Sequence, residues 1–186
     1  MRRLFLTGPI GCGKSTAIEA ALGDRLPLCG GFRTRRGQLR DGHPENFLLE
    51  SPDGSRRAVF LDFSRGAPEV HMEVFADFGI RMLRGDVLIL DEIGGVELLC
   101  PEFMTALDSV LHSGVPILGV MKGEGPAGAL VEALGLTQRY TAAADRLRRW
   151  MEADADTCLY RCGQFDETAA ALSRTWVEEY VHGCVF

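Results

Sequence analysis

The sequence predicts an α/β fold: a three-layer α/β/α sandwich with a mainly parallel β-sheet and a β-hairpin insertion. Three observations support this prediction. Short apolar runs alternate with amphipathic helical patterns, a glycine-rich loop joins the first apolar run to a helix, and 186 residues suffice for one such domain. With 46% hydrophobic and 25% charged residues, the composition is typical of a globular protein. We therefore expect a single domain over residues 1–186, with the β-rich insertion at about residues 35–63.

Strands and helices alternate along most of the chain. Buried parallel strands are expected where short apolar runs occur, at residues 4–7, 87–90, 115–120 and 157–161. Helices are expected at residues 17–22, 69–83, 101–112, 128–134, 141–153 and 167–181, where apolar residues follow helical spacing. Pro101 suits the first position of its helix. This alternation is typical of right-handed βαβ crossovers.

Residues 28–63 break the alternation. They contain short β-prone pieces at residues 29–34, 47–49 and 59–61, separated by Gly, Pro and Asp residues that favour turns. We expect a strand of the sheet followed by hairpins.

The glycine-rich loop matches the P-loop pattern G-x-x-x-x-G-K-[ST]. It follows an apolar strand and precedes a helix, which is the context that supports this motif. Backbone N–H groups of such a loop, together with the helix N-terminus, bind phosphate oxygens. Lys14 is expected to reach the β- and γ-phosphates, and the Ser15 hydroxyl to bind Mg²⁺. The expected nucleotide-binding residues of this P-loop NTPase fold are Gly8, Pro9, Ile10, Gly11, Cys12, Gly13, Lys14, Ser15 and Thr16.

A second motif places acids at the end of an expected strand. Residues 87–90 are apolar and are followed by Asp91 and Glu92. In open α/β sheets, ligands bind at the carboxyl ends of the strands. Asp91 is therefore expected to bind Mg²⁺ with Ser15, and Glu92 to polarise the attacking water. Glu97 is a further acid in the same loop that could support metal, water or a basic residue, although a solvated role is nearly as good an interpretation.

Phosphoryl transfer also needs positive charge near the γ-phosphate. One group of arginines lies in the insertion and another at residues 139–149. The first group is the better candidate for contacts near the γ-phosphate, because residues 30–34 are expected to belong to a strand of the sheet. Contacts to phosphate or to an acceptor are considered for Arg33, Arg35 and Arg36.

The bulk charge limits the classes of partner. A net charge of -6 argues against sequence-independent binding of nucleic acid, which normally needs a basic surface. No apolar stretch is long enough to span a bilayer, and the N-terminus lacks a signal-peptide layout, so a cytoplasmic protein without a membrane partner is expected. The oligomeric state is not indicated by the sequence.

These motifs together resemble the THEP1-like nucleoside-triphosphatase family, which includes the cancer-related nucleoside-triphosphatases. The resemblance extends to about Lys122 and is carried by residues 4–16, 30–34, 88–98, 103 and 117–120. It implies a P-loop enzyme that hydrolyses nucleoside triphosphates slowly with Mg²⁺ and broad base tolerance. The chain departs from the family pattern at several positions: Arg35 and Arg36 replace acids, Gln38 falls near an expected arginine, Gly95 and Val96 follow Ile-Gly, and residues 163–167 replace a Thr-x-x-Asn-Arg element.

Three functions are compatible with these residues. The first is a Mg²⁺-dependent hydrolase acting on ATP, GTP and other nucleoside triphosphates. The second is a nucleotide or small-molecule kinase, in which an acceptor hydroxyl replaces water. The third is a nucleotide-binding switch with negligible turnover. The Asp91-Glu92 pair favours the hydrolase.

Overall fold

The computed structural model describes residues 1–123, 131–132, 135–164 and 166–181. The helix expected at residues 128–134 therefore lies outside the described residues, apart from 131 and 132. None of the described helices is long and apolar enough to cross a membrane.

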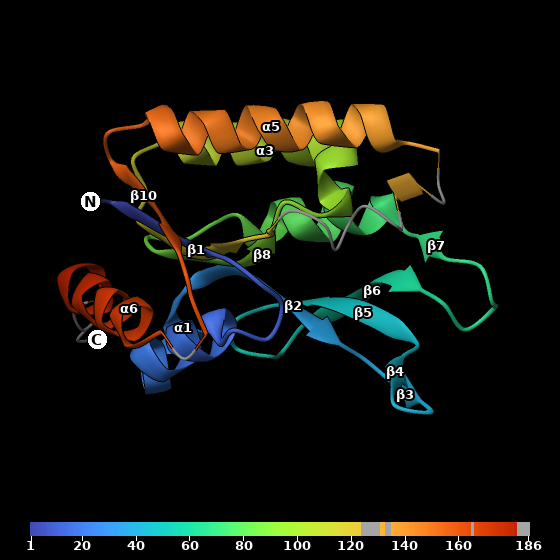
Figure 1. Ribbon diagram of the computed structural model, residues 1–186, viewed down its shortest axis with the longest axis horizontal. Coiled ribbons are helices and arrows are strands. Elements are labelled where there is room, and N and C mark those ends of the chain that lie inside the picture. The colour runs from blue at the N-terminus through green and yellow to red at the C-terminus, as the bar shows by residue number, and fades with distance from the viewer. Residues whose placement is uncertain (124–130, 133–134, 165, 182–186) are drawn as a thin grey trace.

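An eight-stranded sheet forms the centre of the fold (Figure 1), with the strand order β10-β1-β9-β8-β2-β5-β6-β7. The first five strands in this order are parallel, and the last three pair antiparallel. The strands are β1 (Arg3–Thr7), β2 (Gly30–Arg36), β5 (Asn46–Glu50), β6 (Arg57–Asp62), β7 (Glu69–Val70), β8 (Leu88–Ile93), β9 (Ile117–Met121) and β10 (Thr157–Arg161). A separate two-stranded ribbon joins β3 (Leu39–Arg40) to β4 (His43–Pro44).

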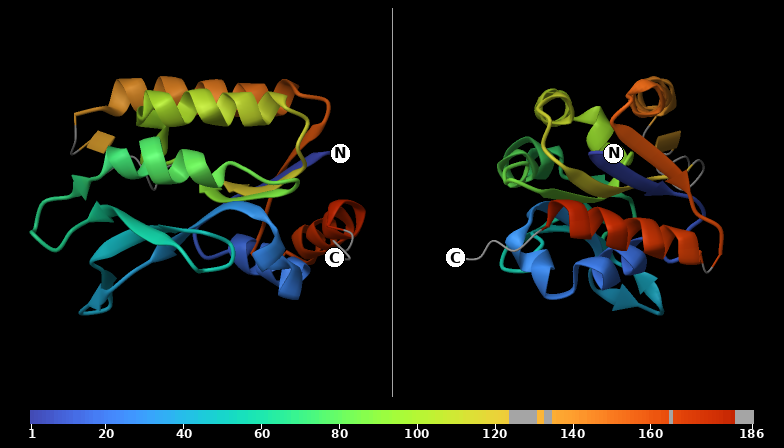
Figure 2. Two further views of the ribbon diagram at one scale, coloured as in Figure 1. Left: turned by 180° about the vertical axis from the view of Figure 1, so that it is seen from behind. Right: turned by 90° about the vertical axis from the view of Figure 1, so that its left-hand side faces the viewer.

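Helices cover both faces of the parallel part of the sheet. In Figures 1 and 2, α1 (Lys14–Leu22) and α6 (Glu167–Tyr180) lie on one face, and α3 (Pro101–His112) and α5 (Thr137–Ala153) lie on the other. The shorter helical segments are η1 (Gly23–Leu28), η2 (Val74–Gly79), α2 (Ile80–Met82) and η3 (Val96–Leu99). The predicted three-layer sandwich is confirmed.

Two apolar cores hold the layers together. On the α3 side, Phe103, Leu107 and Leu111 are buried at the 3–4-residue spacing that places them on one helix face. On the α1 and α6 side, Ile18 and Trp176 are buried against the sheet. The sheet is thus fixed from both faces, and the carboxyl ends of its parallel strands meet at one edge.

The region after β2 differs from the prediction where the expected helix begins. The hairpin strands β5 and β6 extend the sheet beyond β2 (Figure 1). The helix expected from residue 69 begins later, because Glu69 and Val70 form β7 and the N–H of His71 donates to the carbonyl of Phe60. Residues 69 and 70 share the apolar spacing of the helix that follows, but they pair with the edge strand β6 instead of joining that helix.

Candidate active site

The candidate active site lies at the carboxyl ends of β1, β8 and β9. In the parallel register, Leu6 of β1 and Asp91 of β8 both lie opposite Val120 of β9. A cavity of about 440 Å³ opens there. It is lined by Ile10, Gly11, Gly13, Lys14, Ser15, Thr16, Thr34, Arg36, Phe47, Glu92, Val120 and Lys122, and is called the P-loop cavity below.

The P-loop encloses the ammonium group of its own lysine. Lys14 Nζ donates hydrogen bonds to the carbonyl oxygens of Gly8, at 3.0 Å, and Pro9, at 2.7 Å. Gly13 has a φ of 95°, a left-handed conformation that a side chain would strain, and directly precedes helix α1. The Cys12 side chain is buried in the core beneath the loop. The loop therefore presents backbone and a cation to a ligand at the N-terminus of α1.

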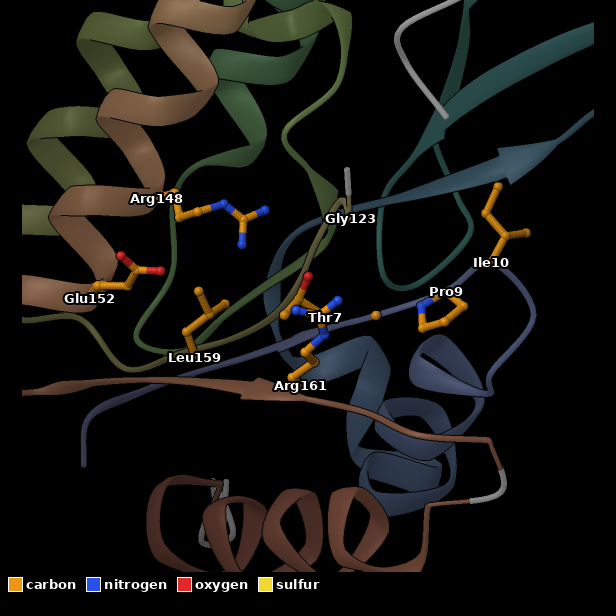
Figure 3. Close-up of a pocket in the computed structure, with 9 residues that line it drawn as sticks. Thr7, Pro9, Ile10, Gly123, Arg148, Glu152, Leu159 and Arg161 are labelled. Carbon is orange, nitrogen blue, oxygen red and sulfur yellow. The ribbon is translucent and has the colours of Figure 1, made fainter. Parts of the chain in front are cut away.

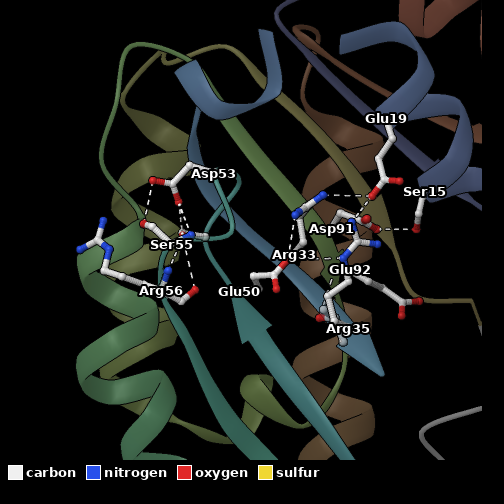
Figure 4. Close-up of polar contacts among 12 residues, drawn as sticks. Ser15, Glu19, Arg33, Arg35, Glu50, Asp53, Ser55, Arg56, Asp91 and Glu92 are labelled. Atoms are coloured by element: carbon white, nitrogen blue, oxygen red, sulfur yellow. Dashed lines mark hydrogen bonds and ion pairs between the residues drawn. The ribbon is translucent and has the colours of Figure 1, made fainter. Parts of the chain in front are cut away.

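Ser15 and Asp91 meet although 76 residues separate them in sequence. The Ser15 hydroxyl donates a hydrogen bond of 2.8 Å to Asp91 Oδ1 (Figure 4). Asp91 is only 2% exposed. Burial raises the pKa of Asp91 to about 6, against the opposing effect of the Ser15 hydrogen bond.

Asp91 has one oxygen atom that no described side chain or backbone group satisfies. Asp91 Oδ2 is buried and has no hydrogen-bond partner among the described residues. An unpaired buried carboxylate oxygen next to a hydroxyl is an oxygen donor set that suits Mg²⁺, which usually takes one or two protein ligands together with phosphates and water. Among the described residues, no cluster of three or more His, Cys, Asp or Glu side chains could hold a metal ion.

Glu92 stands at the mouth of the cavity beside a lysine. Its Oε2 lies 3.6 Å from Lys122 Nζ, at the end of β9. The backbone N–H of Glu92 donates to Thr34 Oγ1 of β2 at 3.5 Å. About a quarter of each of the two charged side chains is exposed, so both can contact a ligand in the cavity.

Glu97 lies behind the loop that follows Glu92 and holds this loop in place. Its Oε1 accepts hydrogen bonds from the N–H groups of Gly94 and Gly95, at 2.5 and 2.8 Å. The Tyr140 hydroxyl donates to the carbonyl of Gly94 at 2.7 Å. Burial raises the pKa of Glu97, and burial followed by the charges of Glu97 and Glu92 raises the pKa of Tyr140 to about 12.

The three arginines of the insertion have different environments. Arg33 pairs with Glu19 of α1 at 3.2 Å and with Glu50 of β5 at 2.7 Å, and Arg35 pairs with the same two acids (Figure 4). These pairs join the hairpin strands to α1. Of the three arginines, Arg36 alone lines the P-loop cavity.

A second cavity lies on the other side of the P-loop. It has a volume of about 460 Å³ and contains Arg148 and Glu152 from α5 and Arg161 from β10 (Figure 3). Gly8, Pro9 and Ile10 form its wall towards the P-loop. Of the second arginine group, Arg148 is therefore the one beside the P-loop, whereas Arg146 lines a separate groove between α3 and α5.

Four residues that line the P-loop cavity were not among the predicted site residues. Thr34, Phe47 and Val120 come from β2, β5 and β9, and Lys122 directly follows β9. The one available signal was for Lys122, which follows an apolar strand as Asp91 does. Thr34 and Phe47 carry no local signature, because the pairing of distant strands brings them to the site.

Comparison with known proteins identifies the family. A protein-family model described as NTPase matches residues 3–141. Nucleoside-triphosphatase THEP1 of Thermococcus kodakarensis is 33% identical over 137 residues, which cover 64% of this chain and 75% of the relative. The cancer-related nucleoside-triphosphatase homolog of Mus musculus is 29% identical over 158 residues, which cover 72% and 82%.

A solved structure supports the fold over the whole chain. The crystal structure of THEP1 from Aquifex aeolicus superposes with a TM-score of 0.62 at 17% sequence identity, covering 97% of this chain and 99% of that one. The family model covers the P-loop, the Asp91-Glu92 strand and the Glu97 loop together. The chain therefore belongs to the NTPase family, a family of P-loop nucleoside-triphosphatases.

Proposed function

We propose that this site hydrolyses nucleoside triphosphates to diphosphates and phosphate with the help of Mg²⁺. Membership of the NTPase family supports nucleoside-triphosphate hydrolysis. The observation that carries the metal and site assignment is the 2.8 Å contact between Ser15 and Asp91 with the unpaired Asp91 Oδ2 beside it. When bound, Mg²⁺ would be held by Ser15 and Asp91 and would neutralise charge on the β- and γ-phosphate oxygens.

Phosphate binding is assigned to residues 8–16. The N–H groups of this loop and of the N-terminus of α1 would donate hydrogen bonds to the phosphate oxygens. Lys14 already lies inside the loop, so its ammonium group would exchange the carbonyls of Gly8 and Pro9 for phosphate oxygens. Because a charge-assisted bond to phosphate is stronger than a bond to a neutral carbonyl, this exchange favours the nucleotide complex.

Glu92 is the residue that we assign to water. It follows Asp91 directly, lies at the mouth of the P-loop cavity and is partly exposed. Its carboxylate can orient a water molecule towards the γ-phosphate and accept the proton that this water loses. Lys122, 3.6 Å away, can offer a positive charge to the γ-phosphate oxygens.

Glu97 is assigned a positioning role. Its carboxylate orders the N–H groups of Gly94 and Gly95, and these residues lead directly out of the strand that carries Glu92. Glu97 also lines a pocket together with Glu92 and Lys122, but it is only 5% exposed. We propose that it keeps the backbone after Glu92 in place rather than contacting the reacting atoms.

Broad tolerance for the base is part of the proposal. The names of the relatives specify nucleoside triphosphates without a base. The contacts described above recognise phosphate and metal, which all nucleoside triphosphates share. ATP, GTP, CTP and UTP are therefore expected to be substrates.

The test is phosphate release from these four nucleotides with and without Mg²⁺. Lys14→Ala should abolish tight triphosphate binding, and Glu92→Gln should retain binding while turnover falls by about two orders of magnitude or more. Glu73→Gln, at an exposed glutamate paired with His71, is the matched control and should retain full turnover. Turnover that survives Glu92→Gln unchanged would remove Glu92 from its role, and phosphate release without divalent metal would contradict the metal assignment.

A further inference from the structure

A pocket with aromatic walls adjoins the P-loop cavity. Phe47, Phe60 and Phe63 line it together with Leu61 and Val96, and its volume is about 220 Å³. Glu92, Lys122, Thr34, Gly95 and Glu97 complete its lining. It is called the aromatic pocket below. Apolar walls with a few polar groups at one end are typical of sites for small organic ligands.

The aromatic pocket and the P-loop cavity share part of their walls. Thr34, Phe47, Glu92 and Lys122 line both spaces. A ligand in the aromatic pocket would therefore contact the same carboxylate and ammonium groups as a phosphate group in the P-loop cavity. The shared residues include Glu92, to which we assign the attacking water.

The aromatic pocket lies on the β2, β5 and β6 side of the contact between Ser15 and Asp91. Ser15 and Asp91 are the residues that would hold Mg²⁺, which would supply positive charge to the phosphates. Beyond Asp91, towards β2 and β5, lie Glu92 and then the phenylalanines, because the sheet continues from β8 to β2, β5 and β6. In-line displacement needs the nucleophile on the far side of the γ-phosphate from the leaving diphosphate. A ligand in this pocket would lie beside Glu92, the residue to which we assign the nucleophile.

The walls of the pocket are held in place by ring contacts. Phe47 packs against Phe60 and Phe63, with ring centroids 6.5 and 6.3 Å apart, and Phe60 packs against buried Phe75 at 5.1 Å. Such contacts stabilise a preformed shape. The volume is below the ~300 Å³ that drug-sized ligands occupy, so it suits a single ring.

We propose that the aromatic pocket binds a second substrate, a small molecule with one apolar or aromatic ring and a hydroxyl group that accepts the γ-phosphoryl group. This inference rests on the proposed nucleotide site and adds an acceptor to it. The hydroxyl oxygen forms a bond to the γ-phosphorus while the bond from that phosphorus to the β–γ bridging oxygen breaks. Glu92 accepts the hydroxyl proton, and the diphosphate leaves with the electron pair of the broken bond.

The chemistry of the pocket mouth fits a hydroxyl rather than water alone. Water needs no apolar chamber, whereas a ring buried against three phenylalanines would place its hydroxyl among Glu92, Lys122 and Thr34. A carboxylate can accept a hydrogen bond from that hydroxyl, and an ammonium group or a threonine hydroxyl can donate to it. Binding the ring thus orients the nucleophile towards the γ-phosphate.

The experiment uses benzyl alcohol as the acceptor probe and toluene as its matched control. Wild-type protein with Mg²⁺ and ATP is incubated with either compound, and phosphorus NMR follows inorganic phosphate and benzyl phosphate. We expect benzyl phosphate with benzyl alcohol, and slower phosphate release without any phosphate ester with toluene. Absence of both effects at saturating solubility overturns the acceptor proposal. Phosphate release without either compound reports on the nucleotide site separately.

Pocket variants localise the effect. Phe63 lines the aromatic pocket but not the P-loop cavity, so Phe63→Trp should fill the pocket while leaving phosphate release from ATP alone unchanged. Benzyl phosphate formation should fall about tenfold or more, the scale of losing apolar pocket contacts. Phe78→Trp is the control, since Phe78 is also partly buried against the same core but does not line this pocket. Equal benzyl phosphate formation in wild type and Phe63→Trp would overturn the assignment of the acceptor to this pocket.

Discussion

Asp91→Asn is expected to make the metal-free protein more stable and the enzyme inactive. Asparagine has the same shape as aspartate, and its Oδ1 can still accept the Ser15 hydroxyl now bound at 2.8 Å. The change removes a negative charge that is 2% exposed and has one oxygen without a partner among the described residues. Burying such a charge costs free energy, so its removal should stabilise the fold.

The magnitude follows from the pKa of the carboxyl group. Burial raises the pKa of Asp91 from 3.8 to about 6. Each pKa unit is worth ~1.36 kcal/mol, so ionised Asp91 destabilises the metal-free fold by about 3 kcal/mol above pH 6. Because the pKa of Asp91 is higher in the folded state than in the unfolded state, the folded state binds the proton more tightly. The free energy of unfolding therefore decreases as the pH rises from about 4 to about 6. Asp91→Asn should therefore equal the wild type near pH 4 and exceed it at pH 7.

The assay is urea unfolding of both proteins in EDTA at pH 4 and pH 7, with Mg²⁺ alone added in a second series. In thermal unfolding of a chain of this length, the same 3 kcal/mol would raise the melting temperature by about 6–12 °C. Mg²⁺ should stabilise the wild type and leave Asp91→Asn unchanged, and phosphate release should be lost in the variant. A variant less stable than the wild type at pH 7 would refute the argument from burial, and Mg²⁺ stabilisation of the variant would refute the metal assignment.

Three further predictions test other parts of the site and fold. Glu97→Ala leaves the N–H groups of Gly94 and Gly95 without their acceptor. The free energy of unfolding should therefore fall by about 1–3 kcal/mol, and turnover should fall as well. A fully active and equally stable variant would contradict the positioning role of Glu97. Lys122→Met keeps the apolar stem of the side chain but removes its charge. This variant should lower kcat by about two orders of magnitude while nucleotide affinity is retained. A change in nucleotide affinity alone would exclude a role of Lys122 in stabilising the transition state. Hydrogen bonds from Ser51 and then Ser55 lower the pKa of Asp53 to about 2. The stabilising effect of ionised Asp53 is therefore present above pH 4 and is lost as the pH falls from about 4 to 2. Asp53→Asn should weaken the loss of stability over this pH range in an unfolding titration, and an unchanged loss would exclude this role of Asp53.

Much of the phosphate-binding side of the site could be predicted from short segments. The P-loop is a strand, a turn and a helix start in one continuous run, so local sequence carries its whole pattern. The strand ending in Asp91 and Glu92 is equally local, and the helix expected at residues 101–112 has those same bounds in the structure. The Glu97 carboxylate was noted as a candidate, but its contacts with Gly94 and Gly95 became visible in the structure.

The pairing of strands could not be predicted in the same way. Residues 69 and 70 continue the apolar spacing of the following helix, yet they form β7 because the edge of β6 offers unpaired backbone groups. Arg33 and Arg35 were considered for contacts to phosphate or to an acceptor. Their ion pairs with Glu19 of α1 and Glu50 of β5 became visible in the structure.

The sequence by itself determined the fold class, the P-loop motif and the acidic strand end, because the pattern of each lies in contiguous residues. The sequence also placed Ser15 and Asp91 at one site, and the structure shows the hydrogen bond between them. Only the tertiary structure decided that Lys122 meets Glu92 and that three phenylalanines form a pocket beside them. These contacts depend on the order and register in which β1, β9, β8, β2, β5 and β6 lie side by side. Strand order arises from burying apolar faces over the whole domain, a non-local requirement that no short segment of sequence contains.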